Sequence, residues 1–393
     1  MPKTIRVAVV GAGFAGQAHA FGYRNAAMAD NLNDVRVELD TIVDPNTALA
    51  EQIAARYGFA RTAASVDEIL DDPSIDAVSV ALPNFVYRDV LARILQSGKH
   101  VFAEKPLGTS AAEAEELADI AAASGKVAAV GFSYRHIPAM AAARRAVVEG
   151  RIGKPYFARG HYFADYSLDP RGARTWRFVQ EQSGGGAVID LGSHLIDALA
   201  HALGPVAEVT SATLNTQITE RPLPTGGIGH TATVSETETG PVTNDDTALL
   251  NVRFESGAVA SLQISRIAAG KPNELGIEIF GSGGHVSFDS SRFDEYSIYE
   301  LEASSPGDDG PRRVIAGPAF PYYNEVSPMR ARGTGTGYGE AFIAEIQEFV
   351  AAVALGEPID TTFAATVHPM RVVQAALDSA STGRPVAVEP YDR

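Results

Sequence analysis

The sequence predicts an N-terminal α/β domain with a parallel sheet, followed by an α+β domain built on a large, mostly antiparallel, open-faced sheet. Strand-like and helix-like segments alternate through the first third of the 393 residues. From Pro155 onward, strand-like segments follow one another with little helix between them. This change of pattern indicates two domains of different class. We place the boundary after residue 134, which gives an N-terminal domain over 1–134 and a C-terminal domain over 135–393.

The first domain shows the regular alternation of βαβ units. Its short apolar stretches predict strands, and the segments between them have helical spacing. The predicted strands cover 5–10, 37–43, 77–81, 100–103 and 127–132, and the predicted helices cover 17–26, 46–57, 86–96 and 111–123. Strands joined in this way run parallel, and such sheets bind ligands beyond the carboxyl ends of their strands.

A glycine motif joins the first strand to the first helix. Gly11, Gly13 and Gly16 form the pattern G-x-G-x-x-G directly after a valine-rich strand. Here the first glycine permits a tight turn, the second lets the backbone approach a pyrophosphate, and the third allows the helix to pack closely on the strand. The helix that follows presents free N–H groups to the phosphates at its N-terminus, and Phe14 and Ala15 of the motif are expected to contact the cofactor with the glycines. The motif predicts a dinucleotide-binding (Rossmann) domain, and the alternative is a glycine turn without a ligand.

Asp44 follows the second predicted strand, where a carboxylate can bind the hydroxyls of the adenosine ribose. It stands 28 residues after Gly16, more than the usual spacing of about 20. A polar insertion over 29–34 accounts for the difference. No Lys or Arg follows Asp44 until Arg56, so we expect no nearby base for a 2'-phosphate. The cofactor is therefore predicted to be NAD rather than NADP.

The composition excludes several classes of function. The chain has 32 Lys and Arg against 48 Asp and Glu, a formal charge of −16, which opposes binding to nucleic acid or to an anionic membrane. No apolar run approaches the roughly 20 residues of a membrane span, and we expect a cytoplasmic protein. The absence of cysteine excludes disulfides, thiolate catalysis and Cys-ligated metal sites, and no metal is expected.

The second domain is predicted from a run of strands and two closing helices. The strands cover 156–162, 206–214, 247–254, 258–265, 276–280 and 285–288, and the helices cover 340–354 and 364–379. Two stretches rich in Gly, Pro and Thr, 220–244 and 304–337, are predicted as long loops. In the first closing helix, apolar residues from Phe342 to Val353 recur at helical spacing, which predicts a buried face.

The open sheet predicts self-association. The segments 249–254 and 259–264 alternate too imperfectly, as a pattern, to leave one face fully solvated. We therefore expect a homodimer or homotetramer joined through this sheet.

A glycine run opens into an apolar helix that carries acid and imidazole groups. After Gly184-Gly185-Gly186, a helix that begins near Val188 places Asp190, His194 and Asp197 on one face. A carboxylate one turn from an imidazole is suited to proton transfer. The alternative is a helix whose polar face meets water.

The strand over 100–103 leads into Glu104-Lys105-Pro106. This position places Lys105 at the carboxyl edge of the sheet, where the nicotinamide of a bound cofactor lies. Its ammonium group could bind a substrate hydroxyl and favour a developing alkoxide. The alternative is a surface lysine at the end of a strand.

Together these motifs resemble the Gfo/Idh/MocA family, which includes glucose-fructose oxidoreductase, inositol dehydrogenase and related sugar dehydrogenases. The matching segments are 11–16, 81–84, 104–106, 176–177, 185–197 and 356–358. The stretch from Ala164 to Arg177 further resembles the levoglucosan dehydrogenase branch, which oxidises a pyranose at C3. The resemblance implies a Rossmann domain, NAD as cofactor and a carbohydrate substrate.

The resemblance also implies roles for individual residues. Lys105, Asp190 and His194 match the family's catalytic group, and the Lys-Pro bond is commonly cis. The residues implied to contact the cofactor, besides the glycine motif and Asp44, are Leu82, Pro83, Asn84, Glu104 and Lys105. Planar and charged side chains that could meet a sugar ring are Tyr134, Arg135, Asp165, Trp176 and Arg177. A neutral cyclic polyol suits these groups better than an acyclic acid.

Four other functions stay open at this point. The resemblance favours an NAD-dependent dehydrogenase that oxidises a secondary hydroxyl, at C3 of a pyranoside or anhydrosugar, and an inositol dehydrogenase would differ from it in substrate alone. An NAD-dependent glycosidase of the same fold would produce no net NADH. A non-catalytic regulator would be expected to lose Lys105, Asp190 or His194, and this chain keeps all three. A zinc hydrolase would need a third ligand beside Asp190 and His194, and none is evident.

Overall fold

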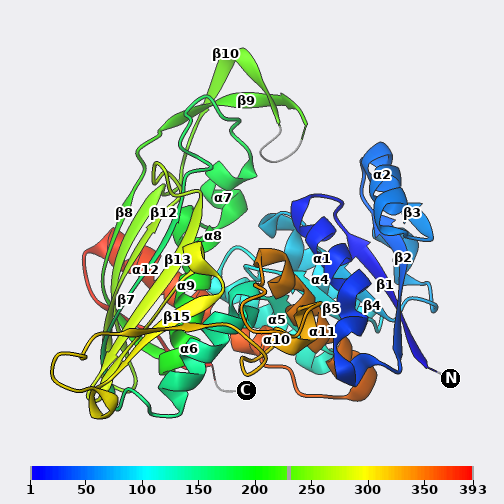
Figure 1. The fold of residues 1–393 in the computed structure, drawn as a ribbon. Coiled ribbons are helices and arrows are strands. Elements are labelled where there is room, and N and C mark those ends of the chain that lie inside the picture. Colours follow the sequence, from blue (N-terminus) through cyan, green and yellow to red (C-terminus); the bar gives the residue numbers. More distant parts are fainter. Residues whose placement is uncertain (1, 228–231, 392–393) are drawn as a thin grey trace. The chain divides into compact units, whose positions relative to one another are not determined.

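The computed structural model describes residues 2–227 and 232–391 (Figure 1). The chain divides into two compact units. The first comprises Met1–Gly108, Ala112–Pro138 and Ala316–Val367, and the second comprises Thr109–Ala111, Ala139–Ile315 and His368–Arg393. Within the described residues, no helix is both long and apolar enough to cross a membrane.

The first unit contains a parallel six-stranded sheet in the order β3-β2-β1-β4-β5-β6. Its strands are β1 (Lys3–Val10), β2 (Val35–Val43), β3 (Arg61–Ala63), β4 (Ala77–Val80), β5 (His100–Glu104) and β6 (Ala128–Gly131). Its helices are α1 (Phe14–Asn25), α2 (Thr47–Tyr57), α3 (Asp67–Leu70), α4 (Tyr87–Gln96), α5 (Ala111–Ser124), α10 (Tyr323–Val326) and α11 (Tyr338–Leu355). The strand order reverses between β1 and β4, and this switch point is where such sheets bind ligands.

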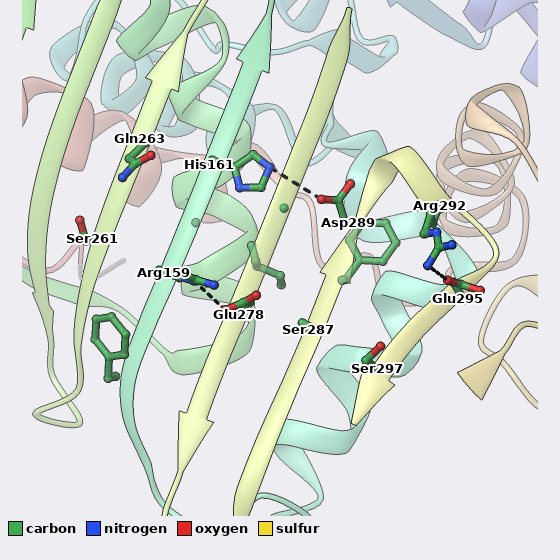
Figure 2. Close-up of a pocket in the computed structure, with 15 residues that line it drawn as sticks. Arg159, His161, Ser261, Gln263, Glu278, Ser287, Asp289, Arg292, Glu295 and Ser297 are labelled. Atoms are coloured by element: carbon green, nitrogen blue, oxygen red, sulfur yellow. Dashed lines mark hydrogen bonds and ion pairs between the residues drawn. The ribbon is translucent and has the colours of Figure 1, made fainter. Parts of the chain in front are cut away.

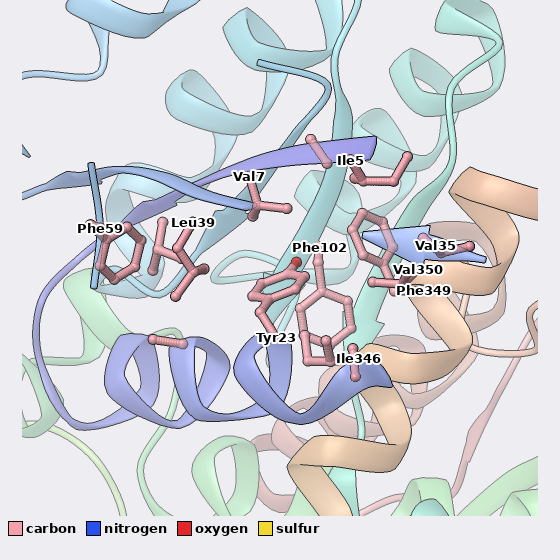
Figure 3. Close-up of a cluster of buried hydrophobic side chains, with 14 of the residues drawn as sticks. Ile5, Val7, Tyr23, Val35, Leu39, Phe59, Phe102, Ile346, Phe349 and Val350 are labelled. Atoms are coloured by element: carbon pink, nitrogen blue, oxygen red, sulfur yellow. The ribbon is translucent and has the colours of Figure 1, made fainter. Parts of the chain in front are cut away.

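The core of the first unit forms where α11 packs on α1 and on the sheet. Figure 3 shows Tyr23 of α1 and Phe102 of β5 beside Ile346 of α11. The approach is close: a Cβ on Gly22 would lie 2.8 Å from both Ile346 Cγ1 and the Phe342 carbonyl oxygen. The predicted apolar face of α11 is confirmed as core, since Ile346 is fully buried and Phe349 is 1% exposed.

The second unit contains a nine-stranded sheet in the order β16-β15-β14-β13-β7-β12-β11-β8-β17. All neighbouring strands are antiparallel except β7 and β12, which pair in parallel. The strands are β7 (Pro155–Ala164), β8 (Val206–Asn215), β11 (Thr247–Phe254), β12 (Val259–Ser265), β13 (Asn273–Gly281), β14 (Gly284–Asp289), β15 (Glu295–Glu300), β16 (Arg312–Ile315) and β17 (Val386–Ala387). The predicted fold class, a parallel Rossmann sheet followed by a large, mostly antiparallel sheet, is confirmed.

Helices cover one face of this sheet and leave the other open. The unit's helices are α6 (Pro138–Val148), α7 (Gln180–Ser183), α8 (Ala187–Asp190), α9 (Gly192–Leu203) and the greater part of α12 (Phe363–Thr382). A Cβ on Gly160 of β7 would lie 2.7 Å from Leu195 Cδ1, so α9 lies directly against β7. In β11 buried residues alternate with exposed ones, and the apolar Leu249 is among the exposed residues.

Three other local predictions differ from the structure. The predicted loop 220–244 contains the hairpin of β9 (Glu220–Gly226) and β10 (Thr233–Pro241), and residues 228–231 lie outside the described part. Most side chains of this hairpin are exposed, so it has no apolar alternation to read. The predicted loop 304–337 contains β16 and α10. The single helix predicted from Val188 is divided at Leu191 into α8 and α9.

Candidate active site

The predicted cofactor residues all follow parallel strands of the first unit. The glycine motif follows β1, Asp44 follows β2, residues 82–84 follow β4, and Lys105 follows β5. Because the carboxyl ends of parallel strands meet at one edge of a sheet, these residues gather at the same edge. The structure thus brings together segments that are up to about ninety residues apart in the chain.

The three positions of the motif need glycine for different structural reasons. Gly11 has φ +102°, and a Cβ there would lie 2.3 Å from the Ala81 carbonyl oxygen. A Cβ on Gly16 would lie 1.8 Å from the Gly11 carbonyl oxygen. A Cβ on Gly13, by contrast, would meet no atom within 4 Å. Packing therefore requires Gly11 and Gly16, while the backbone at Gly13 lies open at the N-terminus of α1, which fits a pyrophosphate.

Asp44 is fixed to the glycine loop. Its Oδ2 accepts a hydrogen bond from Ala12 N and its Oδ1 from Asn46 N, both at 2.9 Å. Each carboxylate oxygen keeps a further lone pair, so the group is held in place and can still accept ribose hydroxyls.

Arg56 lies closer to the glycine loop than its position in the sequence indicated. Its Nη1 donates to Gln17 Oε1 at 3.0 Å, and Gln17 Nε2 donates to the Ala12 carbonyl oxygen at 3.1 Å. A base therefore lies beside the first turn of α1, and the absence of a base placed for a 2'-phosphate at Asp44 stays a prediction. Helix α2 returns its C-terminal turn toward α1, a tertiary contact that spacing along the chain does not reveal.

The Glu-Lys-Pro motif ends β5. The Lys105-Pro106 bond is cis, as the resemblance implied. Lys105 is half-buried, and its backbone N donates to Glu104 Oε2 at 3.2 Å. The other carboxylate oxygen, Oε1, lies 3.1 Å from His19 Nε2. The Glu104 side chain is therefore engaged by the protein itself.

Two predicted substrate residues of the first unit lie in a 3-10 helix (Ser133–His136) after β6. Tyr134 is 2% exposed, and its ring centroid lies 5.6 Å from that of Tyr338. The guanidinium carbon of Arg135 lies 5.7 Å from the centroid of Phe132. Both side chains are thus packed against aromatic rings.

In the second unit, the carboxylate of Asp190 is held from two sides. Tyr166 Oη donates to Asp190 Oδ2 at 2.8 Å, and Arg177 Nη1 donates to Asp190 Oδ1 at 3.3 Å. The Arg177 guanidinium lies 4.5 Å from the centroid of Trp176. The structure thereby brings three predicted residues together, and it adds Tyr166, which the sequence did not single out.

Tyr166 keeps its proton over a wide pH range. The residue is 37% exposed overall, but its hydroxyl is the end that meets Asp190. Burial of that end and the negative charge of Asp190 raise the pKa of Tyr166 well above its usual value. The phenol therefore remains a hydrogen-bond donor to the carboxylate.

His194 lies in the first turn of α9 and is 5% exposed. Its ring centroid lies 5.9 Å from that of Tyr162 in β7. Asp197, one turn further, is 2% exposed, and Asp165 is half-buried at the end of β7. Asp190 and His194 thus stand on either side of the junction between α8 and α9.

The glycine run before α8 is required by a backbone contact. A Cβ on Gly186 would lie 1.8 Å from the Asp245 carbonyl oxygen. The Asp245 carboxylate accepts hydrogen bonds from Gly186 N and Val188 N, both at 2.8 Å. This buried side chain therefore satisfies the N-terminus of the helix that carries Asp190.

Two buried arginines hold the segment that leads to Arg177. The guanidinium carbons of Arg221 and Arg266 lie 4.2 and 4.6 Å from the centroid of Phe178. Arg221 donates to the carbonyl oxygens of Ser167 and Asp169, and Arg266 donates to that of Arg177. Arg266 also pairs with Asp246 at 2.9 Å. Charge and aromatic contacts far apart in the sequence thus fix the backbone of this segment.

A separate hollow of about 660 Å³ lies on the open face of the nine-stranded sheet. Figure 2 shows Arg159 paired with Glu278, and His161 beside Asp289. None of the predicted site residues lines it, and its charged groups largely satisfy one another.

Comparison with known proteins agrees with both halves of the chain. Residues 5–132 match the model of an oxidoreductase family with an NAD-binding Rossmann fold, and residues 140–287 match the GFO/IDH/MocA C-terminal domain. Levoglucosan dehydrogenase of Pseudarthrobacter phenanthrenivorans is 35% identical over 96% of this chain and 97% of its own. The scyllo-inositol 2-dehydrogenase (NAD(+)) of Bacillus subtilis is 28% identical over 99% and 98%.

Solved structures give the same result. Levoglucosan dehydrogenase in complex with NADH superposes with a TM-score of 0.91 at 32% identity, covering 98% of this chain and 100% of that one. Its complex with NADH and levoglucosan also gives 0.91, over 99% and 100%. The chain therefore belongs to the Gfo/Idh/MocA family of oxidoreductases, whose N-terminal domain is an NAD-binding Rossmann fold.

Proposed function

We propose that this protein is an NAD-dependent dehydrogenase that oxidises a secondary hydroxyl of a cyclic sugar or polyol. The favoured reaction is oxidation at C3 of a pyranoside or anhydrosugar such as levoglucosan, which yields a keto sugar and NADH. One observation carries this proposal: Asp190, in the segment that matches the catalytic motif, is held by Tyr166 and Arg177 beside the ring of Trp176. A fixed carboxylate suits sugar hydroxyls, and an aromatic plane suits the apolar face of a pyranose.

The residue roles divide between the two units. His194 takes the proton of the reacting hydroxyl, and Lys105 binds the same oxygen and stabilises it as negative charge develops. NAD, when bound, supplies the hydride acceptor. Because both oxygens of Asp190 already accept hydrogen bonds, we assign this carboxylate to binding an adjacent sugar hydroxyl. Tyr134, Arg135 and Asp165 are proposed as further substrate contacts.

The cofactor contacts are proposed from the carboxyl edge of the parallel sheet. Residues 11–16 hold the pyrophosphate, and Asp44 binds the adenosine ribose. Residues 82–84 and the Glu104-Lys105 segment lie along the rest of that edge. In domain terms, we propose cofactor binding for 1–134 and substrate binding and assembly for 135–393, from which residues 316–367 pack back into the first unit.

A substrate screen tests the proposal. Purified protein is offered levoglucosan, methyl glucosides, inositols and a straight-chain hydroxy acid with NAD or NADP, and NADH formation is followed by absorbance. We expect NADH with a pyranoside or anhydrosugar, and a 3-keto product by NMR. Product without net NADH would indicate the glycosidase, and NAD binding without turnover would indicate a regulator. Turnover of the hydroxy acid alone would refute the substrate class.

Variants of the catalytic group test the roles. Loss of a general base costs about 10² to 10⁴-fold in rate, and we expect His194→Ala and Lys105→Ala each to lower kcat by at least the smaller factor. The affinity for NADH, measured by fluorescence, should survive. His201→Ala, two turns further along α9, is the matched control. Near-normal turnover in either catalytic variant would refute that assignment.

We also propose that the protein assembles as a homodimer or homotetramer through the open face of the nine-stranded sheet. Exposed apolar side chains on this sheet support the proposal: Phe157, Leu249 and Val259 are 41 to 50% exposed. A cytoplasmic location stays a prediction, which cell fractionation would test.

A further inference from the structure

Three acidic and basic groups meet in the interior of the first unit. His19 comes from α1, Glu104 from the end of β5, and Glu345 from α11. Each of the three side chains has one nitrogen or oxygen atom within 4.8 Å of such an atom of the other two. His19 is fully buried and Glu345 is 1% exposed, while the Glu104 side chain is 14% exposed. The cluster is connected to the backbone of Lys105, because Glu104 Oε2 accepts a hydrogen bond from Lys105 N.

One side of the cluster is saturated with hydrogen bonds. His19 Nδ1 lies 2.8 Å from Ser79 Oγ on β4, and Nε2 lies 3.1 Å from Glu104 Oε1. The imidazole also packs edge-on against Phe102, with centroids 5.1 Å apart. The ring is therefore oriented by both nitrogens and by an aromatic neighbour, and it faces the Glu104 carboxylate.

The other side of the cluster is not saturated. Both carboxylate oxygens of Glu345 are buried, and neither has a hydrogen-bond partner among the described residues. The two carboxylates border the same small space: a Cβ on Gly131 would lie 3.4 Å from Glu345 Oε1 and 3.5 Å from Glu104 Oε1. Any larger residue at position 131 would contact both carboxylates.

Two carboxylates this close in the interior do not both carry a charge. Burial, and then the charge of Glu104, raise the pKa of Glu345 well above its usual value. The other titratable groups around the cluster lie on the elements that pack with α11. They are Tyr23 on α1, Lys105 after β5, Tyr338 and Glu348 on α11, and the partners of the last two, which are Tyr134, Arg135 and His136 after β6 and Tyr322 before α10.

We propose that Glu345 is a neutral acid that shares its proton with the Glu104 carboxylate, and that the pair, oriented by His19, positions Lys105. In this arrangement the O–H of the neutral Glu345 is directed at the Glu104 carboxylate. Glu104 Oε2 remains available to the Lys105 N–H. Glu345 is thus a positioning residue that acts on Lys105 through Glu104. This positioning role rests on the proposed function of Lys105, whereas the protonated state of Glu345 does not.

Matched substitutions separate this role from mere filling of space. Glu345→Gln keeps the shape and supplies an N–H donor, whereas Glu345→Leu keeps the volume and supplies none. We expect Glu345→Gln to keep kcat within about twofold. Glu345→Leu should lower kcat by about 10 to 100-fold, as for a lost hydrogen bond to a charged group, with KM for NAD and sugar little changed. Glu340→Gln, on the same helix, is the control.

Infrared spectroscopy of the wild-type protein tests the proton itself. A protonated-carboxyl C=O band at pH 8 should be present in the wild type and in Glu340→Gln, and absent from both Glu345 variants. Absence of the wild-type band overturns the neutral acid. Equal kcat in Glu345→Leu and Glu345→Gln overturns the positioning role, as does an equal loss in both. If the wild type reduces no NAD, the positioning role of Glu345 fails together with the proposed function. The infrared band still shows whether Glu345 is protonated.

Discussion

At the residue scale, the choice of cofactor depends on two side chains with opposite effects. Asp44 is fixed by Ala12 N and Asn46 N at the end of β2, and it would repel a 2'-phosphate. Arg56 reaches the same loop through Gln17 and would attract one. We therefore expect Arg56 to favour NADP when the carboxylate of Asp44 is removed.

We expect Asp44→Ala to lower kcat/KM for NAD by about 10-fold or more, because hydrogen bonds between a carboxylate and the ribose are lost. The ratio of NADP to NAD use should rise. Steady-state kinetics with both cofactors measure this. Arg56→Ala alone should leave NAD use nearly unchanged, and the double variant should lose the NADP gain. Equal use of both cofactors by the wild type would contradict the prediction.

Tyr166 is the residue-scale test of the substrate site. Tyr166→Phe removes one of the two hydrogen bonds to Asp190, and we expect kcat/KM for the sugar to fall by about 10 to 100-fold. KM for NAD should not change, and Tyr156→Phe, in the strand β7 that precedes Tyr166, is the control. Because the pKa of Tyr166 is raised, its hydroxyl stays protonated beyond pH 10. Its hydrogen bond to Asp190 should therefore cause no fall of kcat/KM with rising pH below that value. A fall of kcat/KM near pH 8 that is present in the wild type and absent from Tyr166→Phe would contradict this prediction.

At the element scale, capping groups and imidazoles connect helices to strands. Val206 N, at the start of β8, donates to His368 Nε2 of α12 at 3.0 Å. Burial, and then the charge of Arg371, lower the pKa of His368 to about 4. The imidazole must be neutral to accept this bond. The stability it contributes is complete above the unfolded pKa near 6.5 and is lost as the pH falls toward 4.

We therefore expect the wild type to lose on the order of 2 kcal/mol more stability than His368→Gln between pH 7 and pH 4. The glutamine amide oxygen accepts the same hydrogen bond without titrating. Thermal unfolding of both proteins across this range measures the difference. Parallel curves would show that His368 is already charged in the folded protein or that its bond contributes nothing.

At the scale of the whole molecule, the fold was predictable and part of the site was not. Apolar strands followed by glycines and helices identified the parallel sheet, because buried strands and turns leave strong local patterns. The β9–β10 hairpin left none, because its side chains are mostly exposed. The roles of Tyr166 and Glu345 were not predicted for another reason. Asp190 lies 24 residues from Tyr166 and Glu104 more than 200 residues from Glu345, and only the tertiary structure brings each pair together.

Assembly is the prediction at this scale. Light scattering at micromolar concentration should give two or four times the 41.4 kDa chain mass. Leu249→Glu combined with Val259→Glu places charges on the open face and should shift the mass toward one chain, whereas Leu355→Glu, exposed at the end of α11 in the first unit, should not. A monomeric wild type would contradict the proposed interface.

The two arginines around Phe178 have a consequence for how this protein can change its substrate. They bind the carbonyl oxygens of Ser167, Asp169 and Arg177, groups that every amino acid possesses. Exchanging the side chains of this segment therefore leaves its anchoring bonds intact. The side chains of the segment can therefore change while its backbone keeps the same path. Single substitutions there can alter the preference for a carbohydrate without loss of the fold.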